Sequence, residues 1–459
     1  MDEFRILSPT AILGYGFPAE SFEAGMKRDP HLIAVDAGST DPGPYYLGAG
    51  YSFTDRQAVK RDLQFMLRGA LSKGIPLIIG SAGGSGGNPH LDWNLEIIKE
   101  IATEEKYQFK LAIIRAEIPK EEIIDLYRQT KVFSLPPGPE LKLEDIDAST
   151  RIVAQMGMEP LIKALNCGAR VILAGRCYDP AVFAALAVKE GFDKGLAIHL
   201  GKILECAAIA ATPGSGSDCL MGYLHQHDFE VEPLNKVRRC TTTSVAAHTL
   251  YEKSNPVLLP GPGGLLDLNQ ASFEQVTERR VKVSGSQYSP VNPYRLKLEG
   301  ARQVGYRTVA IAGTRDPIMI GEIDSIIAGV RERVSDNFRE AQLTYFLDFK
   351  VYGKNGVMGA LEPHLKVLGQ ELGIIIEAVA ETQELANTIC SFARSTMLHY
   401  GYYGRIATAG NLAFPYSPSD FKAGAVYAFS IYHLIEISDP IQYFPIEMID
   451  VNGGESNAG

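Results

Sequence analysis

A glycine-rich segment at residues 80–88 has the composition of a loop that binds an anion. It reads Gly-Ser-Ala-Gly-Gly-Ser-Gly-Gly-Asn, follows an apolar run at residues 76–79 and precedes a segment with helical periodicity. Glycines let the backbone approach a ligand closely, and the free N–H groups at a helix start attract negative charge. The spacing matches neither a dinucleotide fingerprint nor a Walker loop. We predict an anion- or substrate-binding loop, with a tight structural connection as the alternative; its contact residues would be Ser81, Gly83, Gly84, Ser85, Gly86, Gly87 and Asn88.

Two carboxylates, Asp36 and Asp41, flank Ser39 and Thr40 directly after the apolar run at residues 32–35. Carboxylate and hydroxyl oxygens are the ligands that Mg²⁺ and Ca²⁺ prefer, and carboxylates also transfer protons. Asp, Ser and Gly are equally typical of a plain turn, which is the alternative. We predict Asp36 and Asp41 as catalytic residues that can also hold a divalent metal, Mg²⁺ or Ca²⁺, and Ser39 and Thr40 as substrate contacts. The sequence leaves the cofactor itself unknown.

Three further positions offer charge or proton transfer at the ends of predicted elements. His90 follows the glycine segment and is a candidate general acid or base, whereas Asp92 is better explained as a helix cap. Arg176 and Asp179 follow the apolar run at residues 169–174, and a guanidinium there can clamp a substrate carboxylate. Arg315 has similar chemistry, although the aspartate beside it offers a local ion pair instead.

Other reactive side chains lack the partners that catalysis would need. His225 and His227 alternate as on a strand, and we favour a solvated strand edge there over a metal site. Cys177 has no obvious histidine partner, and no G-x-S-x-G motif indicates a serine hydrolase. The six cysteines form no C-x-x-C pair, which favours reduced thiols in a cytoplasmic protein.

The elements that must position these residues alternate between strand and helix in the first half of the chain. Apolar runs at residues 32–35, 76–79 and 111–115 are separated by helical patterns such as residues 55–73. This order predicts an α/β fold with a doubly wound, mostly parallel sheet, whose ligands bind at the carboxyl ends of the strands. More polar alternation after about residue 270 predicts a second α+β region. We predict an α/β domain at 1–265, an α+β domain at 266–450 and a disordered tail at 451–459.

Composition excludes several classes of function. The chain has 459 residues and a formal net charge of -10, which disfavours nucleic-acid binding. No apolar run approaches the length of about 18 residues that a transmembrane helix needs, and acidic residues stand where a signal peptide carries basic ones. We therefore expect a soluble, cytoplasmic protein that binds neither nucleic acid nor membranes.

Motifs spread over nearly the whole chain share one resemblance. They are residues 35–48 (Val-Asp-Ala-Gly-Ser-Thr-Asp-Pro-Gly-Pro-Tyr-Tyr-Leu-Gly), 80–93, Gly175-Arg176 with Asp179-Pro180, 245–252 (Val-Ala-Ala-His-Thr-Leu-Tyr-Glu), 298–301 (Leu-Glu-Gly-Ala) and 410–420. Together they resemble the acyclic-terpene-utilisation (AtuA-like) family, in its N-terminal domain. That family is named for gene clusters that degrade branched terpenes through acyl-CoA intermediates. Some members carry a further C-terminal ferredoxin-like domain, which we expect this chain to lack and a small separate partner subunit to supply.

The residues and the resemblance together favour an enzyme of catabolism. We predict action on a small carboxylate or its acyl thioester, by a lyase or hydro-lyase reaction that needs an anion clamp and a proton-transfer pair. One alternative is a nucleotide- or CoA-dependent ligase or transferase in which the glycine segment holds phosphate. The other is a non-catalytic subunit that binds a partner enzyme. Chain length and apolar content favour a homo-oligomer, which would cover any sheet edge left exposed at residues 340–380.

Overall fold

The computed structural model describes residues 2–251, 253–364, 366–406 and 408–454. The chain forms two compact units: unit 1 is Met1–Arg302 with Phe429–Gly459, and unit 2 is Gln303–Ala428. This division differs from the predicted boundary at residue 265, because the strands between 266 and 302 pair with other strands of unit 1. The start of the predicted disordered tail is ordered, because Val451 and Asn452 end a strand; residues 455–459 of that tail lie outside the described residues.

The largest sheet of unit 1 has a parallel centre and antiparallel flanks. The parallel strands follow the order β1 (Phe4–Ser8), β2 (Leu32–Asp36), β3 (Leu77–Gly80), β7 (Val171–Ala174) and β4 (Gln108–Ile114). Antiparallel strands continue beyond β1 as β8 (Leu220–Leu224), β9 (Asp228–Pro233), β13 (Val281–Ser284) and β12 (Ser272–Gln275), and beyond β4 as β19 (Ile446–Asn452). The predicted α/β class with a largely parallel sheet is therefore confirmed.

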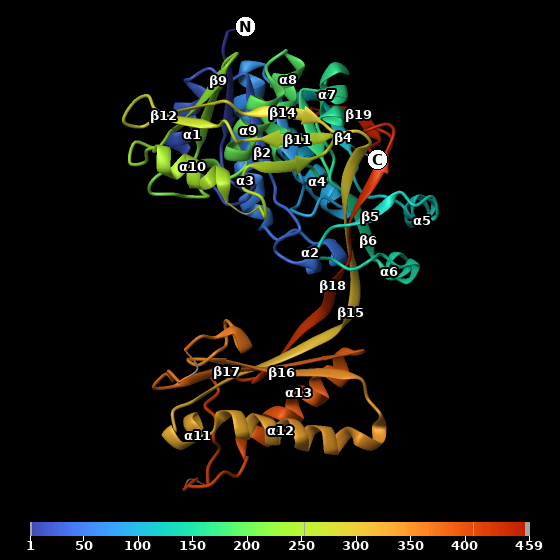
Figure 1. The fold of residues 1–459 in the computed structure, drawn as a ribbon, viewed down its shortest axis with the longest axis vertical. Helices are drawn as coiled ribbons and strands as arrows, with labels where there is room; N and C mark the ends of the chain where they lie inside the picture. Colours follow the sequence, from blue (N-terminus) through green and yellow to red (C-terminus); the bar gives the residue numbers. More distant parts are fainter. Residues whose placement is uncertain (1, 252, 365, 407, 455–459) are drawn as a thin grey trace. The chain divides into compact units, whose positions relative to one another are not determined.

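Helices cover both faces of this sheet, as a doubly wound fold requires (Figure 1). Alternate residues of one strand enter different cores: Ile33 and Val35 belong to one core, Leu32 and Ala34 to the other. The first core contains α1 (Ala19–Met26), α3 (Arg56–Lys73) and α4 (Asn88–Glu105), and the second contains α5 (Lys120–Arg128), α6 (Leu143–Ala148), α7 (Glu159–Asn166), α8 (Asp179–Lys189) and α9 (Lys194–Leu204). Within the described parts of the chain, no helix has the length and apolar content to cross a membrane.

Shorter elements complete unit 1. They are α2 (Pro44–Ala49), the 3-10 helix η1 (Ala207–Ala210), α10 (Thr242–Leu250), and the antiparallel strands β10 (Leu258–Gly261), β11 (Gly264–Asp267) and β14 (Gln287–Pro290). The long strand β15 (Tyr294–Thr314) pairs with β6 (Arg151–Ala154), and β18 (Asp420–Ile437) pairs with β5 (Val132–Ser134). Both long strands begin or end in unit 1 and continue into unit 2.

Unit 2 has the strand and helix order of a split β-α-β fold. Along the chain the order is β15, α11 (Pro317–Gly321), α12 (Ile323–Phe338), the 3-10 helix η2 (Arg339–Ala341), β16 (Tyr345–Tyr352), the 3-10 helix η3 (Gly359–Leu361), β17 (Leu372–Ala380), α13 (Gln383–Leu398) and β18. In the sheet the order is β16-β17-β15-β18, which is the ferredoxin-like arrangement. A unit of this topology is therefore present within the chain itself, and the separate partner subunit stays a prediction.

The two faces of the unit 2 sheet differ in cover. Helices α12 and α13 pack on one face, where Ile374 and Ile376 are buried (Figure 1). On β16, which stands at the end of the strand order, Phe346 and Tyr352 expose 56% and 46% of their surface. An exposed strand edge with apolar side chains is a place where another chain can pair. The predicted oligomer or partner at residues 340–380 remains a prediction.

Candidate functional site

Neighbouring parallel strands bring three of the predicted loops together. The loop after β2 is joined to the end of β3, because the Ala37 N–H donates to the Gly80 carbonyl at 2.9 Å. The loop after β3 is joined to the loop after β7 by the Ser81 N–H to the Gly175 carbonyl at 3.0 Å. The carboxyl ends of parallel strands share one edge of a sheet, so this convergence follows from the fold. The structure therefore brings Asp36, the glycine segment and Arg176 together at one edge of the sheet.

Asp36 is the last residue of β2, and its carboxyl is buried. The residue is 6% exposed, and its Oδ1 has no hydrogen-bond partner in the described part of the chain. Burial raises the pKa of Asp36 well above its usual range, and the nearby charges of Asp179 and Glu205 raise it further, although Arg176 opposes them. Burial beside other carboxylates therefore favours the protonated form of this carboxyl.

Arg176 lies within this region, where carboxylates and carbonyls surround its guanidinium. Its Nε donates to Glu299 Oε2 at 2.7 Å, and its Nη1 donates to Asp179 Oδ1 at 2.8 Å. Burial opposes the charge of Arg176, but Glu299 and Asp179 outweigh it and raise the pKa of the guanidinium. Burial also disfavours the charge of Glu299, but Arg176 and Lys297 lower its pKa to about 2. Arg176 thus carries a permanent charge that two carboxylates already balance.

An ion pair on α9 belongs to the same region and was missed from the sequence. Lys202 and Glu205 are 3% and 8% exposed, and their Nζ and Oε1 atoms lie 2.8 Å apart. The end of α9 meets the carboxyl end of β1, where the Ser8 hydroxyl donates to the Leu204 carbonyl at 2.6 Å. The signal was available: a lysine and a glutamate three residues apart close an otherwise apolar helix. Charged residues are rarely buried unless they are paired.

These charged residues form one group, which we call the strand-end cluster. Its members are Asp36, Arg176, Asp179, Lys202, Glu205, Lys297 and Glu299. Asp179 begins α8, and its side chain is 26% exposed, so it is the most accessible carboxylate of the cluster. Cys177, the former nucleophile candidate, is fully buried beside it, and burial raises the pKa of its thiol to about 12. A neutral thiol of this kind is a weak nucleophile.

The glycines of the predicted binding loop make close packing contacts within the protein. Gly84 has a φ of +94°, and a side chain there would meet the Phe53 ring, which also lies against Gly38. Gly86 has a φ of +68°, and a side chain there would meet the backbone of Arg176. Glycine tolerates both the positive φ and the close approach. These contacts support the structural alternative, because they explain two of the glycines without a ligand.

The polar residues of the same loop are buried and mostly bound to protein groups. The Ser81 hydroxyl accepts hydrogen bonds from Arg176 Nη1 at 3.2 Å and from the Cys177 N–H at 3.3 Å. Ser85 is buried, and its hydroxyl has no partner within the described residues. At the start of α4, the Asn88 N–H donates to Glu117 Oε2 at 2.7 Å. An internal carboxylate therefore occupies the helix N-terminus that was predicted to hold a ligand anion.

His90 and Asp92 have structural contacts in the first turns of α4. His90 is completely buried, and its Nε2 lies 3.0 Å from the Tyr46 carbonyl and 3.1 Å from the Tyr51 carbonyl. Burial lowers the pKa of His90 to about 4, so the imidazole is neutral at pH 7. Asp92 does not cap the helix as predicted, because α4 already begins at Asn88; instead it pairs with Arg115 at 2.9 Å.

The loop after β2 separates the two predicted catalytic aspartates. Asp41 is exposed, and its Oδ2 accepts a hydrogen bond from the Ser39 hydroxyl at 2.8 Å, as in a plain turn. Thr40 is buried and closes the same turn through its carbonyl, which accepts from the Gly43 N–H. Within the described residues, no group of three or more His, Cys, Asp or Glu side chains is arranged to hold a metal ion. The metal site at Asp36 and Asp41 stays a prediction without geometric support.

Arg315 and the stretch 245–252 are not members of the strand-end cluster, although the Lys202 ammonium lies 4.7 Å from the centre of the Tyr251 ring. Arg315 is exposed in unit 2, next to Asp316, which caps α11 through the Ile318 N–H at 2.7 Å. Residues 245–250 of the family-like stretch 245–252 belong to α10, Tyr251 follows the helix, and residue 252 lies outside the described residues. A groove of about 630 Å³ in unit 2, lined by residues such as Arg333 and His399, was not predicted.

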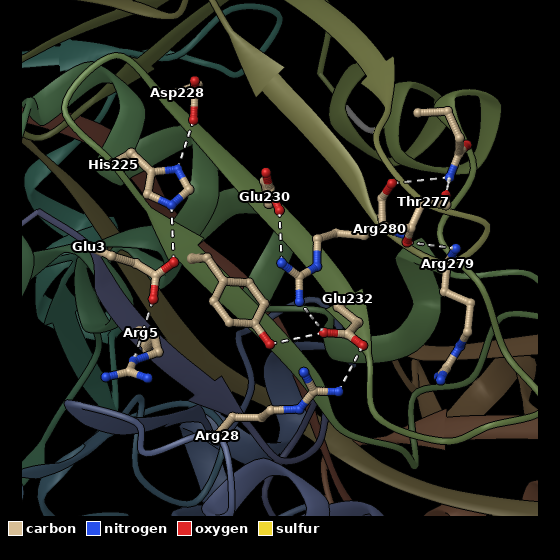
Figure 2. A network of polar contacts seen from close by, with 12 residues as sticks. Glu3, Arg5, Arg28, His225, Asp228, Glu230, Glu232, Thr277, Arg279 and Arg280 are labelled. Atoms are coloured by element: carbon tan, nitrogen blue, oxygen red, sulfur yellow. Dashed lines mark hydrogen bonds and ion pairs between the residues drawn. The ribbon is translucent and has the colours of Figure 1, made fainter.

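A second set of charged residues lies on the antiparallel flank of the unit 1 sheet (Figure 2). We call it the flank network, and its members are Glu3, Arg5, Arg28, Tyr223, His225, Asp228, Glu230, Glu232 and Arg280. In this network the Nδ1 of His225 lies 2.8 Å from Asp228 Oδ1, and its Nε2 lies 3.1 Å from Glu3 Oε2. Its neighbour His227 is exposed. The predicted strand edge is wrong, because both histidines lie in the turn between β8 and β9; His225 is half-buried in ion pairs.

Fold and site together define an α/β protein with a candidate acid–base site at the carboxyl ends of its parallel strands. Residues 50–219 and 233–411 match the model of the family described as acyclic terpene utilisation family protein AtuA. These ranges cover more than half of the chain, so it belongs to the AtuA family and the predicted resemblance is confirmed. Arg176, Asp179 and Glu205 lie within the matched ranges, whereas Asp36 precedes them. No curated protein and no solved structure gives a significant match.

Proposed function

We propose that unit 1 catalyses acid–base chemistry on a small carboxylate or its acyl thioester, as a lyase or hydro-lyase. One observation carries this proposal: Asp36 is a buried carboxyl with a raised pKa and an unpartnered oxygen, next to the charge of Asp179 at the end of a parallel strand. A buried carboxyl beside a more exposed carboxylate is a common basis of paired acid and base roles. Membership of a family named for terpene utilisation is compatible with such a substrate class.

The two aspartates suit opposite roles in the proposed reaction. Asp36, held protonated, donates a hydrogen bond or a proton to an oxygen of the substrate. Asp179 pairs with Arg176 at 2.8 Å, and its side chain is 26% exposed, so it can reach a substrate as the base. His90 contributes less to this proposal, because its imidazole is buried and hydrogen-bonded to backbone carbonyls.

The phosphate-binding alternative receives less support from the same region. The amide of Asn88 is bound to Glu117, and the amides of Gly84 and Gly86 donate to the carbonyls of Ser81 and Ala82. A phosphate would have to displace these partners, including a carboxylate that repels it. We therefore treat the ligase or transferase as the second candidate function.

Deuterium exchange tests the proposal without knowledge of the complete reaction. The full chain is incubated in D₂O with short carboxylates and with their N-acetylcysteamine thioesters, and label at the carbon next to the carbonyl is followed by mass spectrometry. We expect enzyme-dependent exchange, or addition of water across a conjugated double bond, with at least one of these compounds. Absence of both reactions over a panel of chain lengths, with and without Mg²⁺, would refute the proposal.

A further inference from the structure

Ser85, in the glycine segment, is fully buried and has a hydroxyl without a hydrogen-bond partner. No described residue donates to its oxygen or accepts its hydrogen. Ser81 in the same segment is different, because its hydroxyl accepts hydrogen bonds from Arg176 Nη1 and from the Cys177 N–H. A buried hydroxyl without a hydrogen bond lowers the stability of a protein, so its presence calls for an explanation such as a functional role.

The backbone holds Ser85 between the loop after β2 and the loop after β7. On one side, a side chain at Gly38 would come within 3.1 Å of the Gly84 Cα, so these two glycines are in close contact. On the other side, the Arg176 N–H donates to the Gly86 carbonyl at 3.2 Å. Both chain neighbours of Ser85 are therefore fixed against the ends of the parallel strands, which is where a preorganised site needs its groups.

The second group without a partner at this edge of the sheet is the carboxyl of Asp36, the last residue of β2. This carboxyl accepts a backbone hydrogen bond from Gly38, and its Oδ1 has no partner among the described residues. The other oxygen is therefore the acceptor, and in the protonated form the hydrogen belongs on Oδ1. Ser85 and Asp36 thus each have an O–H group that can be donated to a ligand.

We propose that Ser85 is a further catalytic residue, whose hydroxyl donates to the same substrate oxygen as the Asp36 carboxyl. The inference rests on the proposed function and names the second group that holds the reacting carbonyl. A carbonyl oxygen has two lone pairs and can accept both hydrogen bonds. Two fixed donors to one oxygen are a common arrangement for stabilising negative charge that develops during a reaction.

The movements of protons and electrons balance with residues of this chain. When the C–H bond next to the substrate carbonyl breaks, its proton passes to the Asp179 carboxylate and forms an O–H bond there. The electron pair of the broken bond moves to the carbonyl oxygen, which becomes negative. Ser85 donates only a hydrogen bond to this oxygen and keeps its proton, beside the O–H of Asp36. Its contribution is therefore expected in kcat more than in substrate binding.

Thermal unfolding of the full chain tests the state of Ser85 without any substrate. Ser85→Ala removes no hydrogen bond between described residues, so the unfolding temperature should stay equal or rise. Ser149→Ala is the matched control, because Ser149 is 1% exposed but its hydroxyl donates to the Asp145 carbonyl at 2.7 Å. That variant should unfold at a temperature at least about 2 °C lower than wild type. An equal decrease in Ser85→Ala would show that the hydroxyl has a structural role, for example through an internal water molecule, and would overturn the inference.

Deuterium exchange with the compound that exchanges fastest provides the catalytic readout. Ser85→Ala should lower kcat about 10²–10³-fold and change KM little, which is the usual effect of losing one donor to a developing oxyanion. Ser85→Cys keeps a weak S–H donor and should lie between Ser85→Ala and wild type; it also replaces the alanine variant if that variant does not fold. Ser149→Ala should keep the kcat of wild type. A kcat of Ser85→Ala within a few-fold of wild type contradicts the inference.

A double-mutant cycle decides whether Ser85 and Asp36 act on one oxygen. The exchange rates of Ser85→Ala, Asp36→Asn and the double variant are compared with that of wild type. If both groups bind the same oxygen, the loss in the double variant should be smaller than the product of the two single losses. Losses that multiply exactly would assign the two groups to separate positions and remove the shared oxygen.

Binding of acetohydroxamate separates this inference from the proposed function. Its deprotonated form is a small oxyanion, and calorimetric titration in buffer that contains EDTA measures its affinity for the full chain. Ser85→Ala should bind it at least about tenfold more weakly than wild type. That result without deuterium exchange by wild type supports the pair of donors and removes the acid–base function. Exchange that does not depend on Ser85 supports the function and removes the inference, and equal affinity of both proteins for acetohydroxamate also counts against the inference.

Discussion

Two buried carboxylates of unit 1, Asp36 and Glu232, have nearly equal exposure and opposite pKa behaviour. They are 6% and 7% exposed. Glu232 lies in the flank network, where Arg280, Tyr223 and Arg28 contact its two oxygens (Figure 2). Burial opposes its ionisation, but the hydrogen bonds of Arg280 and Tyr223 prevail and lower the pKa of Glu232. Asp36 has a backbone hydrogen bond from Gly38 but no partner at Oδ1, and burial and neighbouring carboxylates prevail and raise its pKa.

The comparison shows that hydrogen-bond and ion-pair partners determine the direction in which the pKa of a buried carboxyl shifts. A carboxylate with several donors is a structural anion, since its charge is fixed and its oxygens are occupied. A carboxyl with an unpartnered oxygen can still form a hydrogen bond with a ligand. Active sites are where such perturbed groups are most often found.

The variant with the largest expected effect changes Asp36, the carboxyl with the unpartnered oxygen. Asp36→Asn should lower turnover about 10²–10⁴-fold, since it removes a transferable proton, and it should leave the unfolding temperature unchanged or raised. The matched control is Glu232→Gln, the same change of acid to amide at similar burial. It should keep turnover and lower the unfolding temperature, because Arg280 and Arg28 lose their anion. Turnover of the Asp36 variant within a few-fold of wild type would make Asp36 structural.

The next prediction concerns the stability of the strand-end cluster. Glu299→Gln should lower the free energy of unfolding by about 3–5 kcal/mol, because it leaves Arg176 and Lys297 without their buried anion. Urea unfolding at pH 7 followed by circular dichroism measures the change. Glu100→Gln is the surface control, where two exposed cations lose a shared carboxylate, and its midpoint should hardly move. Similar midpoints for both variants would show that the cluster is solvated.

The smallest expected effect concerns His225 of the flank network and the pH dependence of stability. Burial opposes the charged imidazole of His225, but hydrogen bonds to Asp228 and Glu3 raise its pKa above the usual value. A raised folded-state pKa stabilises the protein fully below the unfolded value of about 6.5, and this contribution disappears as pH rises through the folded value. His225→Gln should therefore be less stable than wild type at pH 5 and equally stable at pH 9. A pH-independent difference would mean that the imidazole acts through packing alone.

Sequence patterns predicted the sheet and its helices because burial on both faces leaves a readable signal. The apolar runs that became β2 and β3 are short and flanked by loop residues, as parallel strands are. The domain boundary was harder, since β15 and β18 belong to both units and no change of composition marks the crossing.

The candidate site was predicted in part for equally physical reasons. Asp36, Arg176 and Asp179 directly follow strands or begin the next helix, so position along the chain was enough to find them. Lys202, Glu205 and Glu299 could not be found in that way, because a helix end and a distant strand bring them to the cluster. The glycine loop was located correctly, but sequence alone does not reveal that Phe53 and Glu117 fill the contacts of Gly84 and Asn88.

The paired strands β15 and β18 make unit 2 an insertion in the architecture of unit 1. The chain leaves unit 1 after Arg302 and returns at Phe429, on strands that are neighbours in one sheet. A short hairpin between these two strands would be enough to close unit 1 without unit 2. The same site suits exchange of one inserted module for another, since the entry and exit strands lie side by side.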